Sequence, residues 1–258
     1  VTAAGGDFEV LGIDQGERDG QLGTSAIIYQ ATHQTLLDNL MALVDRDVNQ
    51  FSMIVNYGGN SDGYAGGYTS ENIEEVRSGK AAFVAANTNV IWGGHRLDLA
   101  LSDTIHNTAD GYAMASQREV QSYLFYLGIA DHSGDGRKIL SVTVDGSDVT
   151  VNYTPGADLS KIGSGASTIV QISDDDFATL LTVISTVVSA DSVTHTLSAA
   201  PVGSVKVREW WGADIPIASY YSDSNGYAVF PVPQAVSESS GQDIVAVDVE
   251  QKTELLAG

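Results

Sequence analysis

Residues 103–112 read Asp-Thr-Ile-His-Asn-Thr-Ala-Asp-Gly-Tyr and lie at the start of a long run with helical periodicity. Asp103 precedes His106 by three residues, so its carboxylate can accept the imidazole N–H, fix the tautomer and stabilise the imidazolium. This spacing makes His106 a candidate general base and Asp103 the residue that orients it. A base of this kind needs a nucleophile to deprotonate, so the function depends on whether a serine lies within its reach.

The composition describes an acidic globular protein. The chain has 258 residues, 43% of them hydrophobic and 17% charged, and its net charge is -21. That charge repels phosphate backbones and anionic lipids, so nucleic acid is not an expected partner. No apolar run approaches the roughly 18 residues of a membrane span, so no membrane insertion is expected. The acidity fits solubility or a salty medium, with bound divalent cations as the alternative.

Cysteine is absent, which excludes disulfides, thiolate chemistry and Cys-ligated zinc. The chain starts at Val1 without an initiator Met or a signal-like segment. We therefore expect that its true N-terminus was removed or that its numbering starts inside a longer product.

The first half alternates short apolar strands with amphipathic helices. Loops rich in Gly and polar side chains follow the strands, as expected of ligand-handling loops in an open α/β sheet. This order predicts a parallel sheet covered by helices. The expected strands are 7–13, 51–57 and 89–92, the helices 25–48, 71–87 and 108–127, and the loops 14–20 and 58–70.

From about residue 135 the chain becomes mostly β. Asp145-Gly146-Ser147 between two alternating runs predicts a hairpin. Residues 177–188 fit either a short helix or a β-branched strand pair. We predict an α/β domain over 1–134 and a β-rich domain over 135–258, with 203–233 packing back on the first. The expected strands are 139–144, 149–153, 169–172, 192–197, 205–211 and 244–249.

Four blocks of sequence together carry a family resemblance. They are QGERD at 15–19, DTIHNTADGY at 103–112, VREWWGADIP at 207–216 and YSDSNG at 221–226. Their order and spacing resemble the SGNH/GDSL hydrolase superfamily, in its sialate O-acetylesterase and acetylxylan-esterase-like branch. The resemblance covers most of residues 8–128 and again 203–233. It implies a three-layer SGNH-like parallel sheet, lacking its N-terminal part, followed by a β-rich region.

The resemblance also implies roles for single residues. His106 would deprotonate a serine and Asp103 would orient His106, with no metal and no organic cofactor. The loop after the first strand would serve the oxyanion hole and brace it, and two polar residues before the base could line the pocket. Gln15 and Gly16 would serve the oxyanion hole, and Glu17 and Asp19 would brace the loop. The two residues before the base are His95 and Asp98.

The departure from the family concerns the nucleophile. The family's serine follows the first strand and lies well upstream of the QGE block. Only fourteen residues precede Gln15 here, and none is serine. Ser25 fits a helix cap, and Ser61 lies in a Gly-rich loop without a strand-to-helix elbow. The first strand, the nucleophile and part of the oxyanion hole are thus expected on another segment.

Two functions follow. The first is the C-terminal part of an SGNH-type serine esterase that deacetylates carbohydrate, its serine supplied by a separate N-terminal segment or a neighbouring subunit. The second is a catalytically inactive structural or glycan-binding module, for example of a virion surface or tail protein. Both imply a carbohydrate ester or glycan as partner and an extracellular or virion-surface location.

Other candidate residues have simpler interpretations beside functional ones. Among the remaining histidines, His33 is expected on the surface or in packing, and His132 and His195 have no partner at metal-ligand spacing. Asp131-Ser133-Asp135 fits a turn or a calcium loop without its full signature. An aromatic group fits inter-domain packing or a sugar-stacking platform; its members are Trp210, Trp211, Tyr220 and Tyr221.

Overall fold

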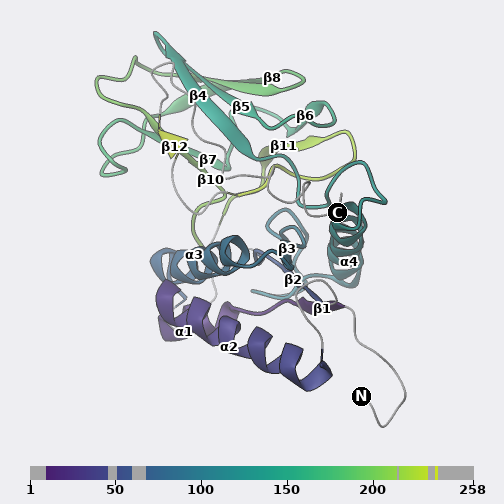
Figure 1. Cartoon of the computed structure of the whole chain (residues 1–258). Helices are drawn as coiled ribbons and strands as arrows, with labels where there is room; N and C mark the ends of the chain where they lie inside the picture. Colours follow the sequence, from purple (N-terminus) through teal and green to yellow (C-terminus); the bar gives the residue numbers. More distant parts are fainter. Residues whose placement is uncertain (1–9, 46–50, 60–67, 214, 232–235, 238–258) are drawn as a thin grey trace. The chain divides into compact units, whose positions relative to one another are not determined.

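The computed structural model describes residues 10–45, 51–59, 68–213, 215–231 and 236–237. The chain divides into two compact units (Figure 1). The first comprises Val1–Asp135 and Trp211–Ile215, and the second Gly136–Trp210 and Pro216–Gly258. The first unit has a parallel sheet with helices and the second has antiparallel sheets, so the expected α/β class is confirmed.

The first unit alternates strands and helices, with a three-stranded parallel sheet in the order β1-β2-β3. Leu11 pairs with Met53, and Met53 with Val90. The elements are β1 (Val10–Ile13), α1 (Glu17–Leu22), α2 (Ala26–Val44), β2 (Ser52–Val55), α3 (Ser70–Ala86), β3 (Val90–Trp92) and α4 (Ala109–Tyr126).

Helices contact the sheet through alternate strand residues. Met53 and Val55 form a buried core cluster with Leu37 of α2 and Phe83 of α3. The side chain between them, Ile54, points the other way because successive strand residues face opposite sides. A Cβ on Gly93 would meet Ile54 and Glu119 of α4, so α4 packs close to the sheet on that second face.

Local chemistry explains where the helices begin. Thr69 accepts a hydrogen bond from the Asn72 amide at 3.2 Å, and Thr108 accepts one from Gly111 at 3.1 Å, so each caps the helix that follows it. Ser25 precedes α2 but makes no capping bond. Residues 17–20 of the expected 14–20 loop instead begin α1, where acidic residues in the first turn suit the helix dipole.

A short segment from far along the chain completes the first unit. The Gly212 amide donates to Glu74 at 2.9 Å, and Arg77 donates to the Gly212 carbonyl at 2.8 Å. Arg77 is fully buried and also donates to the Gly59 carbonyl at 3.2 Å. Gly212 is therefore held by polar groups of α3, and Ala213 joins a core cluster there.

Over its described residues the second unit contains three antiparallel sheets, of orders β4-β5-β9-β8, β12-β10-β7 and β11-β6. Alternating burial along β5 and β9 matches their alternating sequences. The strands are β4 (Ile139–Asp145), β5 (Asp148–Tyr153), β6 (Leu159–Gly163), β7 (Val170–Ser173), β8 (Val183–Val188), β9 (Ser192–Leu197), β10 (Lys206–Glu209), β11 (Ser219–Asp223) and β12 (Val236–Ser237).

The structure resolves the ambiguity at 177–188. Residues 183–188 form β8, and the turn before it is closed by Asp175, whose carboxylate accepts the Thr179 amide at 2.9 Å. The hairpin expected at 145–147 joins β4 to β5. The expected strand 244–249 and Ser61 lie outside the described residues. None of the described helices combines the length and apolar character needed to cross a bilayer.

Candidate functional site

Asp103 and His106 form a hydrogen-bonded pair. Asp103 Oδ1 accepts the backbone amides of Ile105 at 2.9 Å and His106 at 2.8 Å, and its Oδ2 lies 2.8 Å from His106 Nδ1. These bonds, the His106 amide first, lower the pKa of Asp103 to about 2. The carboxylate is therefore ionised at neutral pH and can only accept a hydrogen bond, so Nδ1 is the donor; in the neutral imidazole Nε2 is then the acceptor.

The pair is exposed, but its loop is anchored. The side chains of His106 and Asp103 are 67% and 53% exposed. The Ser102 amide donates to the His106 carbonyl at 2.8 Å. Between the two functional residues, Ile105 is buried in a cluster with Tyr29 and four other residues. The base is thus open to a partner while its backbone is fixed.

Gln15 lies in the turn after β1. The Tyr29 hydroxyl donates a hydrogen bond of 3.0 Å to Gln15 Oε1. The side-chain amide nitrogen of Gln15 donates to the Asp19 carboxylate. Gly16 adopts a φ of 141°, and a Cβ there would lie 2.8 Å from Val76. Only glycine therefore fits this turn. Since one N–H of Gln15 is spent on Asp19, the oxyanion role implied for Gln15 stays a prediction.

Arg96 links this turn to the base loop, and the sequence did not single it out. Its guanidinium donates to Asp14 at 2.7 Å, to Glu17 at 3.0 Å and to Asn107 at 2.7 Å. It is 3% exposed. Asn107 directly follows His106, so one buried cation joins the loops after β1 and before α4. Arg96 lies just past the expected strand 89–92, where ligand-handling loops of an open α/β sheet begin, and this position could have marked it as a candidate site residue.

Lys80 is another buried cation that the sequence did not reveal. Its Nζ would lie 3.2 Å from a Cβ on Gly16, and its hydrogen-bond contact, to the Tyr57 carbonyl, measures 3.5 Å. Burial lowers the pKa of Lys80 to about 8, although Glu17 and Asp14 oppose the shift. The turn carrying Gln15 therefore packs against a buried ammonium group.

The side chains of His95 and Asp98 are 1% and 6% exposed. Arg118 donates to both Asp98 oxygens at 2.7 Å and to the His95 carbonyl at 2.6 Å. Burial raises the pKa of Asp98, but the Arg118 bonds and the His95 charge outweigh it and hold that pKa below its usual range. In this arrangement the two residues brace the loop that leads to the base.

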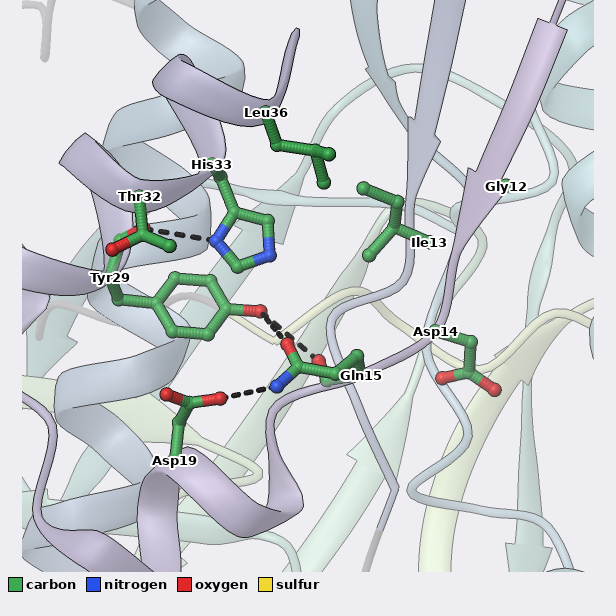
Figure 2. Close-up of a pocket in the computed structure, with 9 residues that line it drawn as sticks. All are labelled: Gly12, Ile13, Asp14, Gln15, Asp19, Tyr29, Thr32, His33 and Leu36. Atoms are coloured by element: carbon green, nitrogen blue, oxygen red, sulfur yellow. Dashed lines mark hydrogen bonds between the residues drawn. The ribbon is translucent and has the colours of Figure 1, made fainter. Parts of the chain in front are cut away.

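A pocket lies between β1 and α2 (Figure 2). Its volume is about 460 Å³, in the range of small-molecule sites. Gln15 and Asp19 line it, but Asp103 and His106 do not. The lining residues are Gly12, Ile13, Asp14, Gln15, Asp19, Tyr29, Thr32, His33 and Leu36.

No hydroxyl among the described residues hydrogen-bonds the His106 imidazole. Ser25 makes no capping bond, and Ser61 lies outside the described residues. Among the described residues, no group of three or more His, Asp or Glu side chains could hold a metal ion. The calcium interpretation of residues 131–135 therefore gains no support. A second carboxylate–imidazole pair exists elsewhere, with His132 Nδ1 at 2.6 Å from Asp131.

The aromatic group does not form an exposed platform. Trp210 and Tyr221 are fully buried in the β-rich unit. The Tyr221 hydroxyl donates to the buried Glu209 carboxylate, and the Trp210 ring lies 5.7 Å from that of Tyr220. These residues serve packing within that unit.

The sequence matches no protein-family model and no curated protein sequence at a significant level. A carbohydrate acetylesterase from Xanthomonas citri is similar in structure, with a TM-score of 0.63 and 15% identity. The alignment covers 90% of this chain and 50% of the esterase, so the chain spans about half that enzyme's length. The chain therefore shares the fold of a carbohydrate acetylesterase.

Two structures of the S-layer protein SbsC match more weakly. Their TM-scores are 0.33 and 0.30, with identities of 17% and 14%. They cover 54% and 64% of this chain, and 17% and 32% of their own chains. Similarities this low carry no argument about the fold or role of this protein.

Proposed function

We propose that this chain is the C-terminal part of an SGNH-type serine esterase that removes acetyl groups from carbohydrate. The observation that carries the proposal is the Asp103–His106 pair, with Nδ1 engaged and Nε2 left as acceptor. The fold shared with a carbohydrate acetylesterase supports the substrate class. The serine nucleophile belongs to a separate N-terminal segment or a neighbouring subunit.

In this mechanism His106 Nε2 takes the proton of the serine hydroxyl as its oxygen attacks the acetyl carbonyl. Asp103 stabilises the imidazolium that forms. The proton then passes to the leaving sugar oxygen, and water activated by His106 hydrolyses the acetyl-serine. Gln15 and Gly16 would border the oxyanion, while Glu17 and Asp19 brace their turn. The reaction needs no metal or organic cofactor.

The test is hydrolysis of p-nitrophenyl acetate and acetylated xylo-oligosaccharide by the protein purified from its source, after its intact mass and N-terminal sequence are determined. His106→Ala should lower kcat by at least about a thousandfold, the scale seen when a triad member is lost. His132→Ala is the matched control, because it removes an imidazole paired with Asp131 outside the site. Equal activity in both variants would refute the proposal.

A second function is favoured by one observation. Among the described residues no hydroxyl is hydrogen-bonded to the His106 imidazole, so we also propose a catalytically inactive SGNH-fold module that binds glycan or serves assembly, for example on a virion surface. Glycan binding by the purified protein, with no His106-dependent turnover and no serine-bearing partner in its source particle, would support it. Either function suits an extracellular or virion-surface location.

A further inference from the structure

Arg96 holds both ends of the turn that carries the candidate oxyanion residues. One terminal nitrogen, Nη2, donates to Asp14 Oδ1 at 2.7 Å and to Glu17 Oε1 at 3.0 Å. Asp14 and Glu17 are the residues on either side of Gln15 and Gly16. A planar guanidinium that binds both carboxylates limits how far the two ends of this turn can separate.

The same side chain holds the loop that carries the general base, residues 99–107. Arg96 Nη1 donates to Asn107 Oδ1 at 2.7 Å, and Asn107 directly follows His106. The side-chain amide nitrogen of Asn107 donates in turn to the carbonyls of Leu99 and Ala100, at 3.2 and 3.4 Å. Asn107 thus ties the two ends of the base loop together, and Arg96 fixes that tie relative to the turn after β1.

The contrast in exposure separates the bracing groups from the group that they brace. Arg96 and Asn107 are each 3% exposed, whereas the His106 side chain is 67% exposed. The Tyr112 ring lies over the guanidinium, with its centroid 5.5 Å from Arg96 Cζ. With so little of its own surface exposed, Arg96 acts through the groups that it binds.

We propose that Arg96 is a positioning residue that sets the separation between the His106 imidazole and the Gln15–Gly16 turn. The inference rests on the proposed function, because that function gives both groups a role on one substrate. Three bonds of 2.7–3.0 Å from one planar group need the guanidinium fork, and the point charge of a lysine does not reproduce them. A misplacement of about 1 Å at a reacting group can cost about a hundredfold in rate.

The kinetic test uses the full protein with p-nitrophenyl acetate, as in the test of the proposed function. Arg96→Lys should lower kcat about ten- to a hundredfold and leave KM within about twofold, because charge is kept while spacing changes. Arg137→Lys is the matched control. It replaces a guanidinium of the second unit that is 4% exposed and equally committed to carbonyls and to Asp191, so it should keep the wild-type kcat.

A second measurement needs no turnover. In the ¹⁵N-labelled full chain, Arg96→Lys should move both the imidazole signals of His106 and the amide signal of Gly16. Arg137→Lys should leave both sets of signals at their wild-type positions. A paired shift means that one side chain sets the position of both loops.

The inference is overturned by an unchanged kcat in Arg96→Lys, by a rise in KM in place of the fall in kcat, by an equal loss of kcat in Arg137→Lys, or by a shift in only one loop. The two proposals fail separately. Without His106-dependent hydrolysis in the wild type the proposed function falls, and the paired shift alone then decides whether Arg96 positions both loops. With that hydrolysis present and full kcat in Arg96→Lys, only this inference falls.

Discussion

Replacing Glu209 by glutamine should remove a pH-dependent loss of stability in the β-rich unit. Glu209 lies on β10, is 1% exposed, and accepts hydrogen bonds from the hydroxyls of Tyr153, at 2.5 Å, and Tyr221. Burial raises the pKa of Glu209 from 4.5 to about 7, although both hydroxyls oppose the shift. Its second oxygen has no partner among the described residues. A neutral side chain of the same shape suits this core better than a carboxylate.

The direction and size of this change in the free energy of unfolding follow from the difference between the folded and unfolded pKa of Glu209. The folded pKa exceeds the unfolded one, so the contribution of Glu209 is fully present below pH 4.5 and is lost as pH rises through about 7. The difference of 2.5 pKa units, 7 minus 4.5, corresponds to about 3 kcal/mol. From pH 4 to pH 8.5 the wild-type free energy of unfolding should therefore fall by about 3 kcal/mol relative to Glu209→Gln.

Urea unfolding of the full chain, followed by tryptophan fluorescence between pH 4 and 8.5, measures this difference. Trp210 is buried next to Glu209 and reports on the unit. Asp158→Asn, at an exposed carboxylate of the same unit, is the control and should keep the wild-type profile. Parallel stability profiles for wild type and Glu209→Gln would refute the reasoning.

Two further predictions concern the first unit. Gly16→Ala should cost about 1–3 kcal/mol, because φ is 141° and the new Cβ would lie 2.8 Å from Val76; an unchanged Tm would contradict the strain. Arg118→Ala should cost about 3–5 kcal/mol by leaving the Asp98 carboxylate buried and unpaired, and Arg118→Ala/Asp98→Ala should recover part of that loss in chemical denaturation. If the double variant is no more stable than the single one, the pair is not what Arg118 stabilises.

The sequence predicted best what depends on neighbouring residues. The bond between Asp103 and His106 closes over three residues, so spacing alone indicated it. The strand–helix alternation of the first unit also follows from local periodicity. The catalytic role of the pair stays a prediction, because it depends on a nucleophilic serine and no serine hydroxyl among the described residues is hydrogen-bonded to His106.

Long-range contacts were not predictable from one chain. Arg96 meets Asp14 across 82 positions and Glu17 across 79, and no local pattern marks such partners. The burial of Asp98 depends on Arg118, twenty residues away on α4. At residues 14–20 the glycines favoured a loop, but the acidic first turn and the packing of α1 on α3 produce a helix from Glu17.

The segment Trp211–Ile215 has a consequence for the order of events during synthesis. It belongs to the first unit, yet it leaves the ribosome after seven of the nine described strands of the second, β4 to β10. Until then the Glu74 carboxylate and the Arg77 guanidinium lack the Gly212 backbone groups that they bind in the finished structure. The α/β half thus begins first but closes late, and a nascent chain that stalls before residue 211 would leave it incomplete.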